Sequence, residues 1–237
     1  MVDLTYPFDE NAAKYPIFKS FEFQVTVNES FPNGVWIQSE EYSSTTHAGT
    51  HMDAPAHFVP AGTTIDQIKL DRFIGPAAVI DIAQRAAVDP DTEVTVGDLL
   101  AWEELAGRTL DGTIIFMRSG WGAKYRNATA YYGTPDNDVS KLRFPGFSPE
   151  AARWLVENRN IRGTGVDTLS LDRGISEDFW AHRMLLGNEI FILENVANLE
   201  KMPLYGATVY VMPMKIAGAS GAPTRVVATY PDLIFNP

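Results

Sequence analysis

The sequence predicts an α/β protein whose β-sheet is mixed or antiparallel. Short runs that are continuously apolar, or that alternate apolar and polar residues, recur along the chain and are typical of strands. Only a few segments between them have the caps and spacing of helices. Residues 21–27 and 35–42 are two strand-like runs joined by a turn signal, which indicates an antiparallel hairpin. Many short strands with few helices indicate this fold class.

The first half of the chain has one clear hairpin and one clearly capped helix. Residues 21–27 alternate apolar and polar side chains, Pro32-Asn33-Gly34 marks a turn, and residues 35–42 form the returning strand. Thr95 can cap a helix because Asp98 follows three residues later. In order, we expect a short strand at 2–5, an irregular segment to Pro16, a half-buried strand at 21–27, its partner at 35–42, a short helical turn within 62–73, a buried strand at 77–82 and a helix from Thr95 to about Leu105.

The second half has one strong helix start, at Ser148-Pro149-Glu150, with a capping Ser, Pro at the first position and an acid in the first turn. Ala152, Leu155 and Val156 give this helix its buried face. Residues 127–147 show neither the hydrophobic periodicity of a helix nor that of a strand. We expect this segment either to cover a site or to form a passive surface loop. The other expected elements are strands at 113–117, 161–166, 190–193, 207–212 and 224–229, loops at 119–122 and 167–174, and a helix at 176–186.

Composition narrows the class of protein. A chain of 237 residues with 45% hydrophobic and 21% charged residues is expected to form a single globular domain over residues 1–237. The net charge of −11 argues against nucleic acid and anionic membranes as partners. The absence of cysteine excludes disulfides, thiolate ligands and a cysteine nucleophile. No apolar run reaches the roughly 20 residues of a membrane helix. The N-terminus lacks signal-peptide features, so we expect a cytoplasmic enzyme. The alternative that a leader peptide preceded this sequence and was removed is not excluded.

The most informative stretch is residues 44–58, S-T-T-H-A-G-T-H-M-D-A-P-A-H-F, which holds three of the four histidines. A glycine and a proline within it disfavour a helix, so an extended backbone is expected. His47, His51, Asp53 and His57 all have odd numbers, and alternate side chains of an extended chain share one face. Imidazole and carboxylate groups suit Zn²⁺, Mn²⁺ or Fe²⁺. The stretch therefore predicts a metal site built from His47, His51 and Asp53.

His57 is left over as the candidate general acid and base. A bound divalent ion lowers the pKa of water to about 7 and polarises a carbonyl, and hydrolysis of an amide or ester also needs a group that moves protons. Imidazole titrates near neutral pH and suits that task. Trp36, Phe58 and Trp121 lie near site segments in the sequence and predict an aromatic substrate pocket.

The stretch also resembles the H-x-G-T-H-x-D-x-P-x-H-F signature of the metal-dependent cyclase-like hydrolases, the family of isatin hydrolase and bacterial kynurenine formamidase. The chain meets every fixed position of this pattern, from His47 to Phe58. The resemblance implies a swivelling β/β/α-type fold assembled as a homodimer or larger oligomer. It also implies that His182 and Glu194 serve the metal centre, in some members as ligands of a second ion shared through Asp53. In a one-metal member, these two residues would orient ligands or substrate.

The resemblance implies a metal-dependent hydrolase that uses one or two Mn²⁺ or Zn²⁺ ions on a small cyclic or aromatic amide. Isatin-type ring opening is the first expectation, and hydrolysis of an aryl formamide such as N-formylkynurenine is the second. Lactones are a further substrate class that the resemblance allows.

Two other functions compete with hydrolysis. His51-x-Asp53 with distant His182 fits the triad of an Fe(II) oxygenase. The second is a non-catalytic metal-binding protein. Residues 218–221 lack the Gly-Lys-Ser/Thr of a Walker motif, so we expect this loop to pack near the site and not to bind phosphate. The sequence contains no Gly-x-Ser-x-Gly elbow, which argues against a serine hydrolase.

Overall fold

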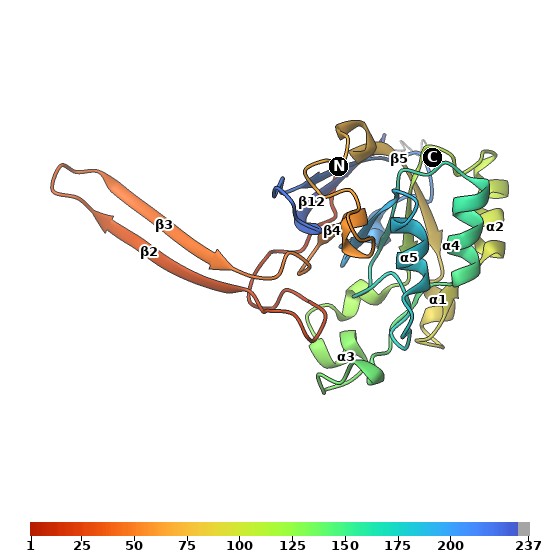
Figure 1. Ribbon diagram of the computed structural model, residues 1–237, viewed down its shortest axis with the longest axis horizontal. Helices are drawn as coiled ribbons and strands as arrows, with labels where there is room; N and C mark the ends of the chain where they lie inside the picture. The colour runs from red at the N-terminus through yellow and green to blue at the C-terminus, as the bar shows by residue number, and fades with distance from the viewer. Residues whose placement is uncertain (232–237) are drawn as a thin grey trace, which may run out of the picture.

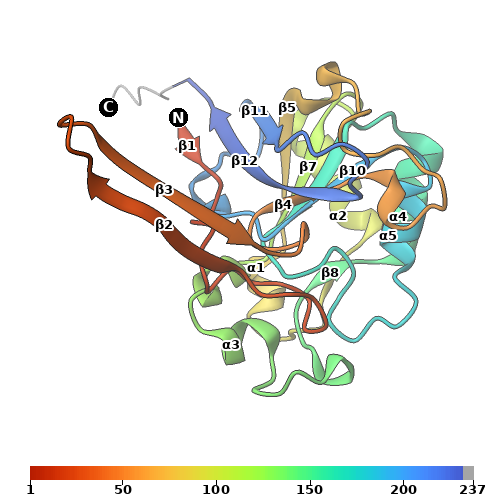
Figure 2. The same ribbon diagram turned by 60° about the vertical axis from the view of Figure 1, so that its left-hand side comes forward.

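The computed structural model describes residues 1–231, which form a rounded body and a long hairpin arm (Figure 1). The strands of the main sheet are β1 (Val2–Asp3), β4 (His51–Asp53), β5 (Ile74–Asp81), β7 (Ile114–Arg118), β9 (Gly163–Val166), β10 (Phe191–Glu194), β11 (Thr208–Pro213) and β12 (Gly221–Thr229). They run in the order β1-β12-β11-β5-β7-β9-β10-β4. Strand β4 also pairs with β12, so the sheet closes on itself (Figure 2).

The closed sheet is mixed, as the sequence predicts. Strands β5, β7, β9 and β10 are parallel to one another, whereas β4, β11, β12 and β1 pair in the antiparallel sense. Along β5, Ala77 and Val79 pack inside the closed sheet, and Ala78 and Ile80 pack toward the helices. The predicted α/β class with a mixed sheet is therefore confirmed, and strands β5, β7 and β10 each contribute to two apolar layers.

Strand β9 shows why its G-T-G-V sequence can pair inside the sheet. A Cβ at Gly163 would lie 2.3 Å from the Phe191 ring, and one at Gly165 would lie 2.7 Å from the Phe116 ring. The two glycines thus leave space that two large aromatic side chains fill, which offsets the weak strand propensity of glycine.

Helices α2 (Val96–Ala106), α4 (Pro149–Asn158) and α5 (Trp180–Leu186) cover one side of the body (Figure 1). Thr95 and Asp98 form the predicted capping box, and the Ser148 hydroxyl caps α4 by accepting from Ala151 N. Helix α5 begins four residues later than expected, because Phe179 has a φ of 50° and lies outside the helix. The remaining elements are α1 (Ala83–Ala86), α3 (Ala128–Tyr132), β6 (Glu93–Val94), β8 (Gly146–Phe147) and the 3₁₀ turns at Pro55–His57, Leu70–Phe73, Trp121–Lys124, Val139–Lys141 and Leu199–Lys201.

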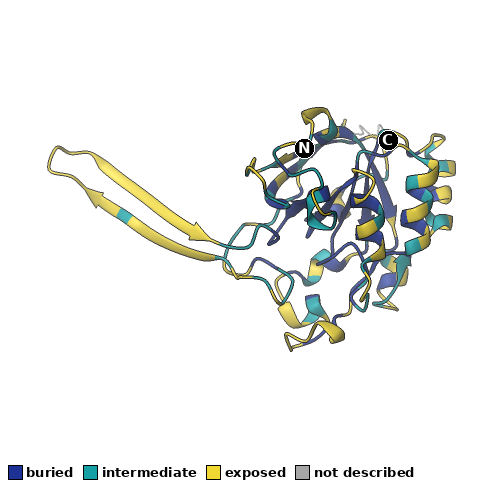
Figure 3. Ribbon diagram, in the orientation of Figure 1, coloured by how far each residue is buried: buried dark blue, intermediate teal, exposed yellow. Residues whose placement is uncertain are grey.

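The predicted hairpin is present as β2 (Glu22–Ser30) and β3 (Trp36–Ser43), and it forms the arm (Figure 1). The expectation that its first strand is half-buried was wrong. Every residue of β3 is exposed, and in β2 only Val27 is partly covered (Figure 3). The alternating pattern predicted the strand correctly, but the arm projects from the body, so within residues 1–231 little of its surface is covered, apart from contacts of Tyr42 with Phe8 and Met214.

Trp121 and the segment at 127–147 are structural in this fold. Trp121 is buried in a separate cluster with Tyr125 and Tyr131, and its Nε1 donates to Tyr131 O over 2.9 Å. The segment at 127–147 contains α3, a 3₁₀ turn and β8, so it is more ordered than an irregular excursion. Tyr132 of this segment hydrogen-bonds to the backbone of Lys14, and no residue of the segment lines the cavity at the candidate metal centre. No helix within residues 1–231 has the length and apolarity to cross a membrane.

Candidate metal centre

The backbone brings the motif together by three different local structures. His51 and Asp53 lie on β4 and face the same side, with Met52 pointing into the core. His47 reaches the site before a turn at Gly49, whose φ is 61°, and His57 ends a 3₁₀ helix. The parity argument was therefore right for His51 and Asp53 but wrong for the two outer histidines.

The exclusion of helical structure from this stretch was also wrong over Pro55–His57. Pro55 occupies the start of the 3₁₀ helix, where its missing N–H has no partner to lose. The short helix turns the chain so that His57 faces His47, and the two rings stack with centroids 3.9 Å apart. The histidines converge as predicted, although their convergence depends on turns more than on an extended strand.

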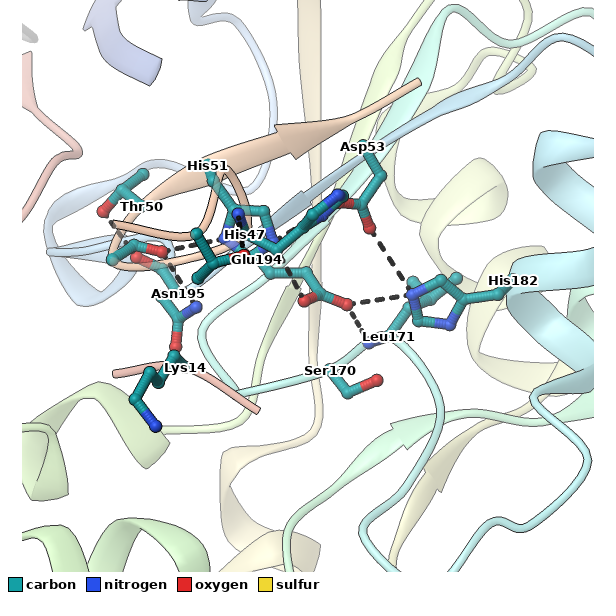
Figure 4. Close-up of polar contacts among 12 residues, drawn as sticks. Lys14, His47, Thr50, His51, Asp53, Ser170, Leu171, His182, Glu194 and Asn195 are labelled. Atoms are coloured by element: carbon teal, nitrogen blue, oxygen red, sulfur yellow. Dashed lines mark hydrogen bonds and ion pairs between the residues drawn. The ribbon is translucent and has the colours of Figure 1, made fainter. Parts of the chain in front are cut away.

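Asp53 lies between His47 and His182 (Figure 4). Its Oδ1 is 2.7 Å from His47 Nδ1 and 3.3 Å from His51 Nε2. Its Oδ2 is buried and has no hydrogen-bond partner within residues 1–231, and His182 Nε2 lies 3.5 Å away. A buried carboxylate oxygen without a partner is costly unless another group satisfies it, so this atom points to a cation.

Strand pairing and α5 add the residues that are distant in sequence. Strand β10 pairs with β4 so that Glu194 lies opposite His51, and Glu194 Oε2 is 3.4 Å from His51 Nε2. Helix α5 carries His182, whose Nε2 is 3.0 Å from Glu194 Oε1. Leu171 N also donates to Glu194 Oε1 over 2.9 Å. The five residues that we expected at the metal centre therefore lie together.

Two sets of three side chains have ligand atoms within 4.8 Å of one another: His47, Asp53 and His57, and His51, Asp53 and Glu194. Both sets share Asp53, and imidazole nitrogens with carboxylate oxygens suit Zn²⁺ and Mn²⁺. Together with the unpartnered Asp53 Oδ2, this donor set fits a divalent ion. The grouping differs from our expectation, because His57 belongs to a potential ligand set, His47 and His51 fall in different sets, and His182 is in neither.

The carboxylates make the site favourable for positive charge. Burial alone would lower the pKa of His51, but Asp53 and Glu194 outweigh burial and raise this pKa to about 10. Burial would raise the pKa of Asp53, but the surrounding imidazoles hold it well below its usual value. His57 differs from these two residues, because burial lowers its pKa to about 4. His57 is therefore uncharged at neutral pH and can accept a proton.

A third carboxylate, which the sequence did not single out, orients His182. Asp172 Oδ2 lies 2.6 Å from His182 Nδ1, and the Asp172 carboxylate also accepts from Ala181 N and His182 N at the start of α5. Nδ1 then donates to Asp172, which leaves Nε2 free toward Asp53 and Glu194. The sequence feature that could have identified Asp172 is an acidic residue shortly before the helix that carries the candidate ligand His182.

Asp172→Asn is expected to weaken metal binding by about 10- to 100-fold, because a neutral amide holds and polarises His182 less strongly than a carboxylate does. Competition with a chromogenic chelator measures the affinity. Asp178→Asn is a matched control, since Asp178 is exposed on the same segment. Equal affinities in the two variants would show that Asp172 does not support the metal centre.

Two further residues, Asn195 and Ser220, form hydrogen bonds with the motif, and the sequence analysis did not identify them. Asn195 Nδ2 donates to Gly49 O over 2.9 Å, and the same carbonyl oxygen lies 2.9 Å from His51 Nδ1. Ser220 Oγ lies 3.0 Å from His47 Nε2. The expectation that residues 218–221 pack near the site is thereby confirmed. No local sequence pattern distinguishes Asn195 or Ser220 from ordinary polar loop residues.

Gly221 leaves the space that His47 occupies. A Cβ at this position would lie 2.5 Å from His47 Cε1 and 2.8 Å from Met52 O. We expect Gly221→Ala to displace His47 and to lower metal affinity by about 10-fold or more. Gly97→Ala is the control, because its Cβ would meet no atom closer than 3.5 Å within α2. That control should keep metal affinity and should not lower stability, since alanine is favoured over glycine in a helix, as judged by chelator competition and thermal unfolding. Unchanged affinity in Gly221→Ala would contradict the role of His47.

A cavity of about 220 Å³ opens onto the metal centre. Its aromatic lining comes from Tyr15, Phe18, Phe58 and Phe179. Of the three aromatic residues that we expected in the pocket, only Phe58 lines it. Trp36 is on the arm, 58% exposed and opposite Ser30 beside the turn, and Trp121 is buried in the neighbouring cluster. Proximity in sequence misled in both cases, because the arm and the turn after β7 carry these side chains elsewhere.

Comparison with known proteins agrees with this geometry. A family model described as "Putative cyclase" matches residues 2–173. Isatin hydrolase from Roseibium aggregatum is 32% identical over 194 residues, which cover 78% of this chain and 72% of that protein. Kynurenine formamidase from Paracidovorax citrulli is 28% identical over 185 residues, covering 78% and 76%.

The fold is shared as well. The structure of isatin hydrolase A from Ralstonia solanacearum has a TM-score of 0.87 at 30% identity and covers 96% of this chain and 90% of that one. These relatives are named as hydrolases, so the chain is an enzyme of that class, and the iron oxygenase alternative has no support among them. The chain belongs to the cyclase family of metal-dependent hydrolases.

Proposed function

We propose that the enzyme opens the C–N bond of a small cyclic aromatic amide, as in the conversion of isatin to isatinate. One observation carries this proposal: five imidazole and carboxylate side chains surround Asp53 at the end of a pocket lined with aromatic rings. The identity with an isatin hydrolase adds support. A flat aromatic amide fits such a pocket, because aromatic rings stack well on one another.

In this proposal His47, His51 and Asp53 hold a Mn²⁺ or Zn²⁺ ion. His182 and Glu194 complete the same site or hold a second ion with Asp53. When bound, the ion supplies a water of lowered pKa and polarises the scissile carbonyl. His57 takes the proton from the attacking water and gives a proton to the amide nitrogen as the C–N bond breaks. Phe58 lies against His57 with ring centroids 4.8 Å apart and lines the pocket beside it.

Hydrolysis of an aryl formamide is the second candidate, and the kynurenine formamidase relative favours it. Initial rates on isatin and N-formylkynurenine, measured side by side with Mn²⁺- and Zn²⁺-loaded enzyme, separate the two. Fast isatin opening with little deformylation supports the first proposal. The reverse result assigns the enzyme as a formamidase. Turnover of neither substrate would overturn both.

The arm supports a further part of the proposal, a homodimer. An isolated two-stranded hairpin is only marginally stable in water, and the arm makes little contact with its own body. Phe23 lies opposite Tyr42, and Trp36 shares the face of Tyr42, so one face of the arm carries exposed aromatic side chains. A second copy of the chain is always available to cover this face, and a two-fold interface would bury both arms.

The oligomeric state tests this arrangement. Light scattering coupled to size-exclusion chromatography should give a dimer mass for the wild type and a monomer mass for the double variant Phe23→Ser/Trp36→Ser. A matched pair of polar changes on the opposite face of the arm, Gln24→Ser/Glu41→Ser, should stay dimeric. A monomeric wild-type protein would contradict the proposed role of the arm.

A further inference from the structure

The carbonyl oxygen of Gly49 fixes which nitrogen of His51 is available to an ion. It lies 2.9 Å from His51 Nδ1, and a carbonyl oxygen only accepts hydrogen bonds. In the neutral ring that binds an ion, Nδ1 therefore carries the proton, and the free lone pair is on Nε2. Nε2 lies 3.3 Å from Asp53 Oδ1 and 3.4 Å from Glu194 Oε2, so it faces the other members of its ligand set. The position of the Gly49 carbonyl thus sets the orientation of the His51 ring.

Asn195, the residue that follows β10, holds this carbonyl group in place. Its Nδ2 donates to Gly49 O over 2.9 Å (Figure 4). The backbone of Asn195 is fixed as well, because its N–H donates to Thr168 O over 3.0 Å and its carbonyl accepts from Thr50 Oγ1 over 2.7 Å. Its φ is 53°, in the left-handed region that asparagine tolerates better than most residues. The amide supports the carbonyl only when Nδ2, and not Oδ1, faces it.

Tyr131 determines which way the Asn195 amide faces. The Tyr131 hydroxyl donates to Asn195 Oδ1 over 2.9 Å, and this bond turns Nδ2 toward Gly49 O. A flipped amide would place Oδ1 against Gly49 O, and two oxygens that only accept hydrogen bonds repel each other. Both side chains are fully buried, so water does not compensate for such a loss.

Tyr131 is itself held firmly by the elements around α3. Its ring packs edge-on against Tyr125 with centroids 5.3 Å apart, and its carbonyl accepts from Trp121 Nε1 over 2.9 Å. Its hydroxyl has a second acceptor in reach, Asp167 O, over 3.2 Å. No residue of the segment 127–147 lines the cavity, and yet this hydroxyl connects the segment to the metal centre.

We propose that Tyr131 and Asn195 are positioning residues that hold His51 with Nε2 directed at the ion. The hydrogen bonds run from the phenol through the amide and the Gly49 carbonyl to Nδ1 of the imidazole. This inference rests on the proposed function, since it concerns the ion that His51 would bind. The two residues act on affinity for the ion through the orientation of one ligand ring.

Metal affinity, measured by competition with a chromogenic chelator, tests this role without reference to activity. Tyr131→Phe removes only the hydroxyl, and the loss of one hydrogen bond should weaken binding of Zn²⁺ and Mn²⁺ by about 3- to 10-fold. Asn195→Gly removes the amide, suits the left-handed backbone and should weaken binding by about 10- to 100-fold. In the double variant, Tyr131→Phe should have no further effect, because the tyrosine acts only through the amide that it orients.

Tyr132→Phe is the matched control. It removes a hydroxyl from the same helix, but this hydroxyl bonds to the backbone of Lys14 and not to the motif. Metal affinity should therefore stay at the wild-type value.

The His51 ring provides a second readout. The chain has only four histidines, so nuclear magnetic resonance of the Zn²⁺-loaded protein resolves their ring protons one by one. The Nδ1 proton of His51 should exchange with solvent faster in Tyr131→Phe than in the wild type, and at the wild-type rate in Tyr132→Phe.

Three results would overturn the positioning role. They are equal metal affinities of the wild type and Tyr131→Phe, losses that add in the double variant with Asn195→Gly, and an equal loss in Tyr132→Phe, which would indicate a general loosening of α3. A wild-type protein that binds neither Zn²⁺ nor Mn²⁺ would instead overturn the proposed metal site itself, and the positioning role with it.

Discussion

Asp53→Asn is expected to lower kcat/KM by about 10³-fold or more and to leave the purified protein without bound metal. Asp53 lies within 3.5 Å of three imidazoles and belongs to both potential ligand sets. Loss of a residue that only supports a ligand typically costs 10- to 100-fold, so loss of the central carboxylate should cost more. Asparagine keeps the size of the side chain, so the effect comes from the missing charge and ligand oxygen.

Elemental analysis after dialysis measures the metal content, and thermal unfolding with and without added Mn²⁺ or Zn²⁺ measures binding without reference to activity. The wild type should unfold at a higher temperature with metal, since a ligand that binds only the folded state stabilises it. Asp136→Asn is a control, because Asp136 is an exposed carboxylate paired with Lys141. A variant at Asp53 that retains a full complement of metal would contradict the site as described.

His57→Ala is expected to keep bound metal while kcat falls by about 10²- to 10⁴-fold, the range for loss of a general acid and base. His57 is uncharged at neutral pH, stacks on His47 and lines the pocket, so its free nitrogen can exchange protons with a bound substrate. His51, Asp53 and Glu194 remain in the variant as a complete ligand set. Metal content and turnover are measured on the same preparation.

Chemical rescue sharpens this test. Imidazole added to His57→Ala should restore part of the activity by occupying the space of the missing ring, whereas the wild type should not respond. His57 also belongs to a ligand set with His47 and Asp53. If the variant instead lost half or all of its metal, His57 would be a ligand, and the proton-transfer role would have to belong to another residue.

Local sequence patterns determined much of this structure. The hairpin at β2 and β3, the capping box at Thr95 and the start of α4 at Ser148 were predictable, because turns and caps depend on neighbouring residues. The buried strands of the mixed sheet were predictable from their apolar runs. The short motif from His47 to Phe58 identified the central metal-site candidates, because the residue types themselves define the chemistry.

Only the tertiary structure decided what lies beside these elements. The pairing of β10 with β4 brings Glu194 to His51, and the closure of the sheet through β12 brings Ser220 to His47. Sequence spacing contains no such information, because strand register and sheet closure depend on contacts between distant segments. The same reason explains the errors over Trp36 and Trp121 and the failure to identify Asp172. The sequence alone determined the chemistry of the site, and long-range packing determined which residues surround it.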